Sequence, residues 1–189
     1  MNKIEIFAGE HVPGDLVHGW PHIERVLFYA ERVNRELKAD RDIVRAACLL
    51  HDTGHSIGKE QHHLHSRVLA ETLLARLEIG PETIKHIAEC IAAHSRQYSP
   101  EPPASPEARV LYDADGMDLF GAVGLMRGLL SAAEGNRGFP AIIKKLEWRL
   151  SQVDNFYSTC ARGFVKEHAP LIRQFLEQLK QQLQWFTKA

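Results

Sequence analysis

The sequence has little of several features that would assign it to a class directly. Its three cysteines are scattered, which excludes a disulfide framework and a cysteine zinc knuckle and is typical of buried residues in a reducing compartment. The 23 lysines and arginines balance 24 aspartates and glutamates, so the composition indicates neither a nucleic acid nor a membrane partner. No apolar run is long enough to span a bilayer, and the first residues lack the pattern of a secretory leader. We therefore expect a cytoplasmic protein.

What the sequence does contain is helical periodicity from residue 21 onwards. Apolar residues recur at intervals of three and four along each segment between glycine and proline breaks, and almost no stretch alternates as a strand does. Residues 1–19 read as an irregular lead-in. Asp40 or Asp42 suits the start of one helix and Ser105 that of another, because short polar side chains cap helix N-termini. The pattern predicts an all-α protein.

Eleven histidines are the unusual part of the composition, and several interrupt otherwise apolar faces. Five predicted helices each carry a polar group on such a face: His22, His51 with Asp52, His65, His94 and Asp115. Each has an ordinary explanation as a hydrogen-bonded core residue or, for Asp115, as a partner of Arg25 or Arg109. Gly54 could likewise be a simple helix cap. Buried imidazoles and carboxylates are costly unless they are paired or bind a metal. Polar groups on the apolar faces of five helices therefore favour a metal site. A ligand set without cysteine suits Mn, Fe, Ni, Co or Zn and argues against a structural zinc.

The order of these residues resembles the HD-domain superfamily of metal-dependent phosphohydrolases. The segment His22–Val26 is similar to the family's HxxRV, Ala46–Asp52 to its AAxLLHD, and Ile91–Ser95 to its IxxHS. The segment Glu107–Arg127 resembles the EAxxxxDADxxxxxGAxGxxR block of small bacterial members. The resemblance implies a helical bundle with a metal site in a central cleft. We expect one domain over residues 1–189, with the metal-binding core at about 18–130 and C-terminal helices at about 140–186 packing on it.

The resemblance also implies roles for individual residues. His22, His51, Asp52 and Asp115 would hold one divalent ion (Mn, Fe, Ni, Co, Mg or Zn). His65 and His94 are similar to the additional ligands of dinuclear members, in which the equivalent of Asp52 bridges two ions. Gly116 departs from the lysine or arginine that commonly follows the last aspartate. The candidates for catalysis besides Asp52 are Arg25, which would orient Asp115 or Asp52, together with His55 and Lys59. The candidates for substrate binding are His62, Arg96 and Arg127.

We therefore expect an enzyme that hydrolyses a phosphoester or pyrophosphate bond of a nucleotide or a similar small phosphorylated molecule. Two alternatives remain open. The first is an HD-type di-iron oxygenase, because such oxygenases have a similar set of six ligands and some share the HDxGH motif found at His51–His55. The second is a non-enzymatic metal- or nucleotide-sensing module. The expected partner is the small substrate, with no nucleic acid or membrane, and a homodimer is left open.

Overall fold

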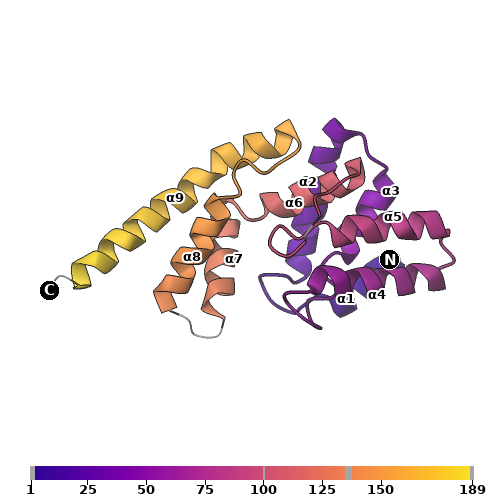
Figure 1. The fold of residues 1–189 in the computed structure, drawn as a ribbon, viewed down its shortest axis with the longest axis horizontal. Coiled ribbons are helices and arrows are strands. Elements are labelled where there is room, and N and C mark those ends of the chain that lie inside the picture. The colour runs from indigo at the N-terminus through magenta and orange to yellow at the C-terminus, as the bar shows by residue number, and fades with distance from the viewer. Residues whose placement is uncertain (1–2, 100, 135–137, 188–189) are drawn as a thin grey trace. The chain divides into compact units, whose positions relative to one another are not determined.

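The protein is helical throughout the part of the chain that the structure describes. This computed structural model describes residues 3–99, 101–134 and 138–187, and within these ranges every regular element is an α-helix. The all-α prediction is thereby confirmed. The chain forms two compact units, Met1–Gly116 and Met117–Ala189, which are described separately below (Figure 1).

The first unit is organised around helix α3. It contains α1 (Lys3–His11), α2 (Trp20–Leu37), α3 (Arg41–Leu50), α4 (His62–Arg76), α5 (Pro81–Ala92) and α6 (Pro106–Met117), the last of these up to Gly116. Helix α3 packs against α1, α2, α4 and α5, and α4 packs along α5 (Figure 1). Because α3 is surrounded, its second half from Ala46 to Leu50 is buried. The residue that follows this apolar run, His51, is therefore delivered to the interior of the unit.

Helix caps anchor the elements that carry the predicted site. The Asp40 carboxylate accepts hydrogen bonds from the backbone N–H groups of Asp42 and Ile43, so Asp40 is the cap of α3. At the start of α6 the Ser105 hydroxyl accepts from the N–H of Ala108 at 3.1 Å. The Glu107 carboxylate accepts from the N–H of Asp40 at 2.9 Å, which joins the first turn of α6 to the start of α3.

Two local expectations were wrong. Residues Lys3–His11 form α1 instead of an irregular lead-in. The helix buries only Ala8, and its Glu5 forms an ion pair with Arg45 of α3, so tertiary contacts rather than a strong apolar pattern hold it. Helix α4 begins at His62, two residues later than the periodicity indicates, because residues 51–61 form a turn-rich segment.

The second unit contains α7 (Gly121–Ala133), α8 (Gly138–Leu150) and α9 (Thr159–Thr187), each of which packs against the other two. The buried guanidinium of Arg149 donates a 2.7 Å hydrogen bond to the carbonyl of Leu119, which fastens α8 to the start of α7. The expectation that all 189 residues form one domain stays a prediction. Among the described helices, none combines the length and hydrophobicity that a membrane crossing requires.

Candidate metal centre

The two carboxylate oxygens of Asp52 face two different groups of histidines. Oδ2 lies 3.5 Å from Nε2 of His22 and 3.6 Å from Nε2 of His51. Oδ1 lies 3.7 Å from Nε2 of His62 and 3.6 Å from Nε2 of His94. All five side chains are buried and belong to the first unit. Asp52 therefore stands between two sets of nitrogen donors, one for each of its oxygens.

Asp115 completes the first set. Its Oδ1 lies 3.4 Å from Nε2 of His22, and its side chain is 19% exposed. Three groups of donor atoms are close enough together to hold an ion: His22, His51 and Asp115; His51, Asp52 and His94; and Asp52, His55 and His62.

The rings of three histidines are oriented by the same kind of hydrogen bond to a backbone carbonyl. The Nδ1–H groups of His51, His62 and His94 each donate to a carbonyl three residues earlier, at 2.8, 2.7 and 2.6 Å. For His51 and His94 the acceptors are the carbonyls of Cys48 and Ile91, which lie in the last turns of α3 and α5. A carbonyl oxygen can only accept, so Nδ1 carries the proton and Nε2 presents a lone pair in the neutral ring. Fixing the tautomer in this way is what a metal-ligating histidine requires.

Imidazole Nε2 atoms face one another in two pairs, and in the His62–His94 pair both of them carry a lone pair. Nε2 of His22 lies 3.3 Å from Nε2 of His51, and Nε2 of His62 lies 3.1 Å from Nε2 of His94. Two facing lone pairs repel unless a positive charge lies between or beside them. The chemistry of these donors therefore fits one or two divalent cations with nitrogen and oxygen ligands.

The ionisation of the cluster agrees with this conclusion. Burial lowers the pKa of His51 to about 4 and that of His62 to about 3, so both rings are neutral at pH 7. Burial opposes ionisation of Asp52, but the nearby histidines, His51 first, hold its pKa well below the usual range. Burial also opposes charge on His94, yet the hydrogen bond and charge of Asp52 raise its pKa. Asp52 thus favours a positive charge at this place, whether a proton or a metal ion.

The structure brings together five of the six predicted metal ligands and replaces the sixth. His65 is absent from the donor groups of the described residues, and its ring lies instead against the turn at Gly58, where a Cβ would be 3.2 Å from Nε2. His62, predicted to bind substrate, takes the place beside His94. The cause is the phase of α4: the two residues are three apart, and the helix begins with His62 facing Asp52.

The remaining candidates lie around the cluster at different depths. His55 is largely buried, with Nε2 3.8 Å from Oδ1 of Asp52, and burial lowers its pKa. Lys59 is exposed, and its carbonyl accepts the His62 hydrogen bond. Arg25 is half-buried on α2, one turn after His22, and its orienting role stays a prediction. Arg96 is half-buried, lies 3.8 Å from the centre of the Tyr112 ring and donates to the Tyr112 carbonyl.

Arg127 is placed differently from the substrate-binding expectation. It is 5% exposed within the second unit and forms a 2.8 Å ion pair with Asp118, which is 1% exposed. Its Nη1 also donates to the Asp118 carbonyl at 3.1 Å. Both contacts lie within this unit, and the substrate-binding role of Arg127 stays a prediction.

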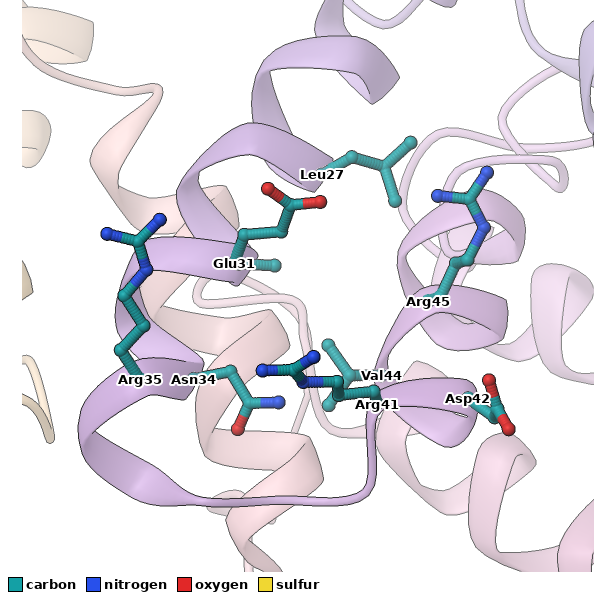
Figure 2. Close-up of a pocket in the computed structure, with 9 residues that line it drawn as sticks. Leu27, Glu31, Asn34, Arg35, Arg41, Asp42, Val44 and Arg45 are labelled. Atoms are coloured by element: carbon teal, nitrogen blue, oxygen red, sulfur yellow. The ribbon is translucent and has the colours of Figure 1, made fainter.

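A separate groove of about 400 Å³ lies between α2 and α3 (Figure 2). Its charged side chains alternate in sign, as Figure 2 shows for Glu31 and Arg35 of α2 and for Arg41, Asp42 and Arg45 of α3. None of the residues lining it belongs to the metal-ligand cluster. Three arginines and two carboxylates are the charged residues that line the groove.

Comparison with known proteins agrees with the site. The family model of the HD domain matches residues 19–119, which is more than half of the chain, and the chain belongs to this family. The uncharacterized protein YpgQ of Bacillus subtilis is 26% identical over 174 residues, covering 88% of this chain and 84% of YpgQ. The crystal structure of YpgQ in complex with ADP superposes with a TM-score of 0.75 at 24% identity, over 95% of this chain and 96% of that chain.

Two further solved structures share the fold. A protein from Lactobacillus plantarum has a TM-score of 0.81 at 20% identity, covering 96% of this chain and 95% of that one. A predicted HD superfamily hydrolase from an uncultured Thermotogales bacterium has a TM-score of 0.66 at 19% identity, covering 96% and 91%. The HD-like helical fold expected from the sequence is thereby confirmed.

Proposed function

We propose that this protein is a metal-dependent phosphohydrolase that cleaves a phosphoester or pyrophosphate bond of a nucleotide or a similar small molecule. The observation that carries the proposal is the position of Asp52, with Oδ2 facing His22 and His51 and Oδ1 facing His62 and His94. Membership of the HD family and the ADP complex of the similar protein YpgQ support a phosphorylated substrate of the nucleotide class.

In this proposal the donors divide into two ligand sets that share one carboxylate. His22, His51, Asp115 and Asp52 would hold a first divalent ion, and His62 and His94, again with Asp52, would hold a second. A bound divalent ion lowers the pKa of water towards 7 and neutralises phosphate charge. The carbonyls that fix the Nδ1 protons of His51, His62 and His94 leave the Nε2 atoms of these three rings without a proton that an ion would have to displace.

His55 is the residue placed to act on the substrate itself. Its ring lies against the second ligand set, and its lowered pKa leaves it neutral at pH 7, so that it offers a hydrogen bond rather than a charge to a phosphate oxygen. Lys59, exposed four residues later, would supply the positive charge that His55 lacks.

The competing function is a di-iron oxygenase, because six histidine and aspartate donors also suit iron. Reconstitution separates the two. The chelator-treated protein is loaded under nitrogen with Mn, Mg, Co, Ni, Zn or Fe(II) and assayed with nucleoside mono-, di- and triphosphates and a chromogenic phosphodiester. The proposal expects phosphate or nucleotide release with a redox-inert metal, and loss of turnover in Asp52→Ala with every metal. Activity that needs iron and consumes O₂ would overturn it.

A further inference from the structure

Three imidazole rings form a stack that runs from a loop into the metal-ligand cluster. The ring centres of His18 and His55 are 3.8 Å apart at an interplanar angle of 23°, and those of His55 and His62 are 4.3 Å apart at 20°. His62 is at the inner end, where its Nε2 meets His94. His55 is thus held between two parallel rings, one of which belongs to the proposed ligand set and one of which does not.

Hydrogen bonds and close packing fix the backbone of the loop that carries His18. The Asp15 carboxylate accepts hydrogen bonds from the N–H groups of both Val17 and His18 at 2.7 Å. Val17 is buried, so the loop is attached to the core next to His18. At Gly19 a Cβ would lie 2.3 Å from the carbonyl oxygen of Asp15 and 2.6 Å from that of Pro13, so only glycine fits this turn. His18 therefore comes from a fixed backbone, four residues before His22.

We propose that His18 is a positioning residue that acts through His55. By stacking on the outer face of the His55 ring, it keeps Nε2 of His55 at the edge of the second ligand set, 3.8 Å from Oδ1 of Asp52, where His55 would meet a phosphate oxygen held by the second ion. This inference rests on the proposed function, because it takes His55 as the phosphate contact. A histidine ring with one open face has several staggered rotamers, whereas a ring between two others is confined to one.

The expected kinetic result follows from this role. His18→Ala raises KM for the phosphorylated substrate by about two- to tenfold, the factor that corresponds to one lost ring-stacking contact. It changes kcat less and leaves the bound metal unchanged, because His18 belongs to none of the donor groups that could hold an ion. His18→Phe keeps a flat ring at the same place and restores KM.

The experiment is a double-mutant cycle with ATP and Mn²⁺ on the full-length protein. If His18 acts through His55, then His18→Ala has no further effect on KM in the His55→Ala background. Independent, additive effects would overturn the proposal, as would a His18→Phe variant as impaired as His18→Ala. The matched control is His11→Ala, which removes an imidazole stacked at 3.8 Å on Phe7 of α1 and should leave KM unchanged.

A second measurement does not depend on turnover. In the metal-free protein the neighbouring rings shift the proton resonances of the His55 imidazole upfield, and His18→Ala should move them back while His18→Phe keeps them. An unchanged His55 spectrum in His18→Ala would contradict the stack. If the wild-type protein hydrolyses no phosphorylated substrate, the proposed function fails, and the spectrum still decides whether His18 orders His55.

Discussion

The backbone N–H of Gly54 donates a 2.8 Å hydrogen bond to the side-chain hydroxyl of Ser66. This bond joins the turn after His51 and Asp52 to the second turn of α4, and Ser66 is completely buried. The two segments approach so closely that a Cβ on Gly54 would lie 2.4 Å from the backbone nitrogen of Ser66 and 2.6 Å from the carbonyl oxygen of His62. The glycine thus sets the distance between Asp52 and His62.

Gly54→Ala should therefore weaken both the fold and the second ligand set. These two clashing atoms are backbone and a third, at 2.6 Å, is the Cβ of His65, so relief requires α4 to move away. The overpacking cost is about 1–3 kcal/mol. We expect a lower melting temperature for the metal-free protein and fewer bound ions after reconstitution. Gly163→Ala is the control, since no atom lies within 4 Å of its Cβ and an exposed helical glycine gains stability on becoming alanine. Equal melting temperatures for Gly54→Ala and wild type would refute the role of this contact.

The second prediction distinguishes two histidines of the same helix. Because Nε2 of His62 lies 3.7 Å from Asp52 while His65 lies against Gly58, His62→Ala should lose one of two bound ions and His65→Ala should keep both. The measurement is metal content by elemental analysis after reconstitution with Mn²⁺ and removal of excess metal. If His65→Ala instead binds one ion and His62→Ala binds two, then His65 is the metal ligand, as the sequence analysis expected.

This pair also shows where sequence reasoning stops. Apolar periodicity located α2, α3 and α5 and placed His22, His51 and His94 on inward faces, because each continues a long stripe. The sequence analysis gave His65 as the ligand instead of His62, one turn earlier, because the choice between them depends on how the turn at Gly54 packs against α4. His18 was not identified because ring stacking between a loop and a turn leaves no periodic pattern.

The third prediction concerns Arg127. Its buried ion pair with Asp118 implies that Arg127→Met leaves an uncompensated carboxylate and costs about 3–5 kcal/mol. Arg127→Met with Asp118→Leu should recover part of the loss, because no buried charge remains. Chemical unfolding gives these free energies, and KM of the folded variant should match wild type. A raised KM with unchanged stability would instead support the substrate-binding role expected from the sequence.

The fourth prediction is the acid sensitivity of the metal-free protein. Burial lowers the pKa values of His51 and His62 to about 4 and about 3, so below pH 6.5 the unfolded chain binds protons that the folded protein does not. The stability contributed by these neutral rings is present above pH 6.5 and is lost as the pH falls towards 4. His51 alone accounts for about 3 kcal/mol at 1.36 kcal/mol per pKa unit. The raised pKa of His94 acts in the opposite direction. The folded protein binds this proton more tightly than the unfolded chain does, which offsets part of the loss.

Urea unfolding of chelator-treated protein between pH 7.5 and 4.5 tests this sign. The free energy of unfolding should fall steadily below pH 6.5, and a saturating divalent ion should restore it near pH 6.5, because the ion occupies the donors that would otherwise be protonated. A free energy that stays constant or rises on acidification would contradict the assignment of neutral, buried histidines.

The central claim is that water, activated between the two donor sets around Asp52, attacks phosphorus. The most direct test is to follow the oxygen isotope during turnover of the Mn²⁺-loaded protein with a nucleotide in H₂¹⁸O under nitrogen, with mass spectrometry of the products. The account predicts one ¹⁸O atom in the phosphoryl product for each bond cleaved, with no oxygen gas required. Turnover only with iron under ¹⁸O₂, with product oxygen derived from the gas, would contradict it.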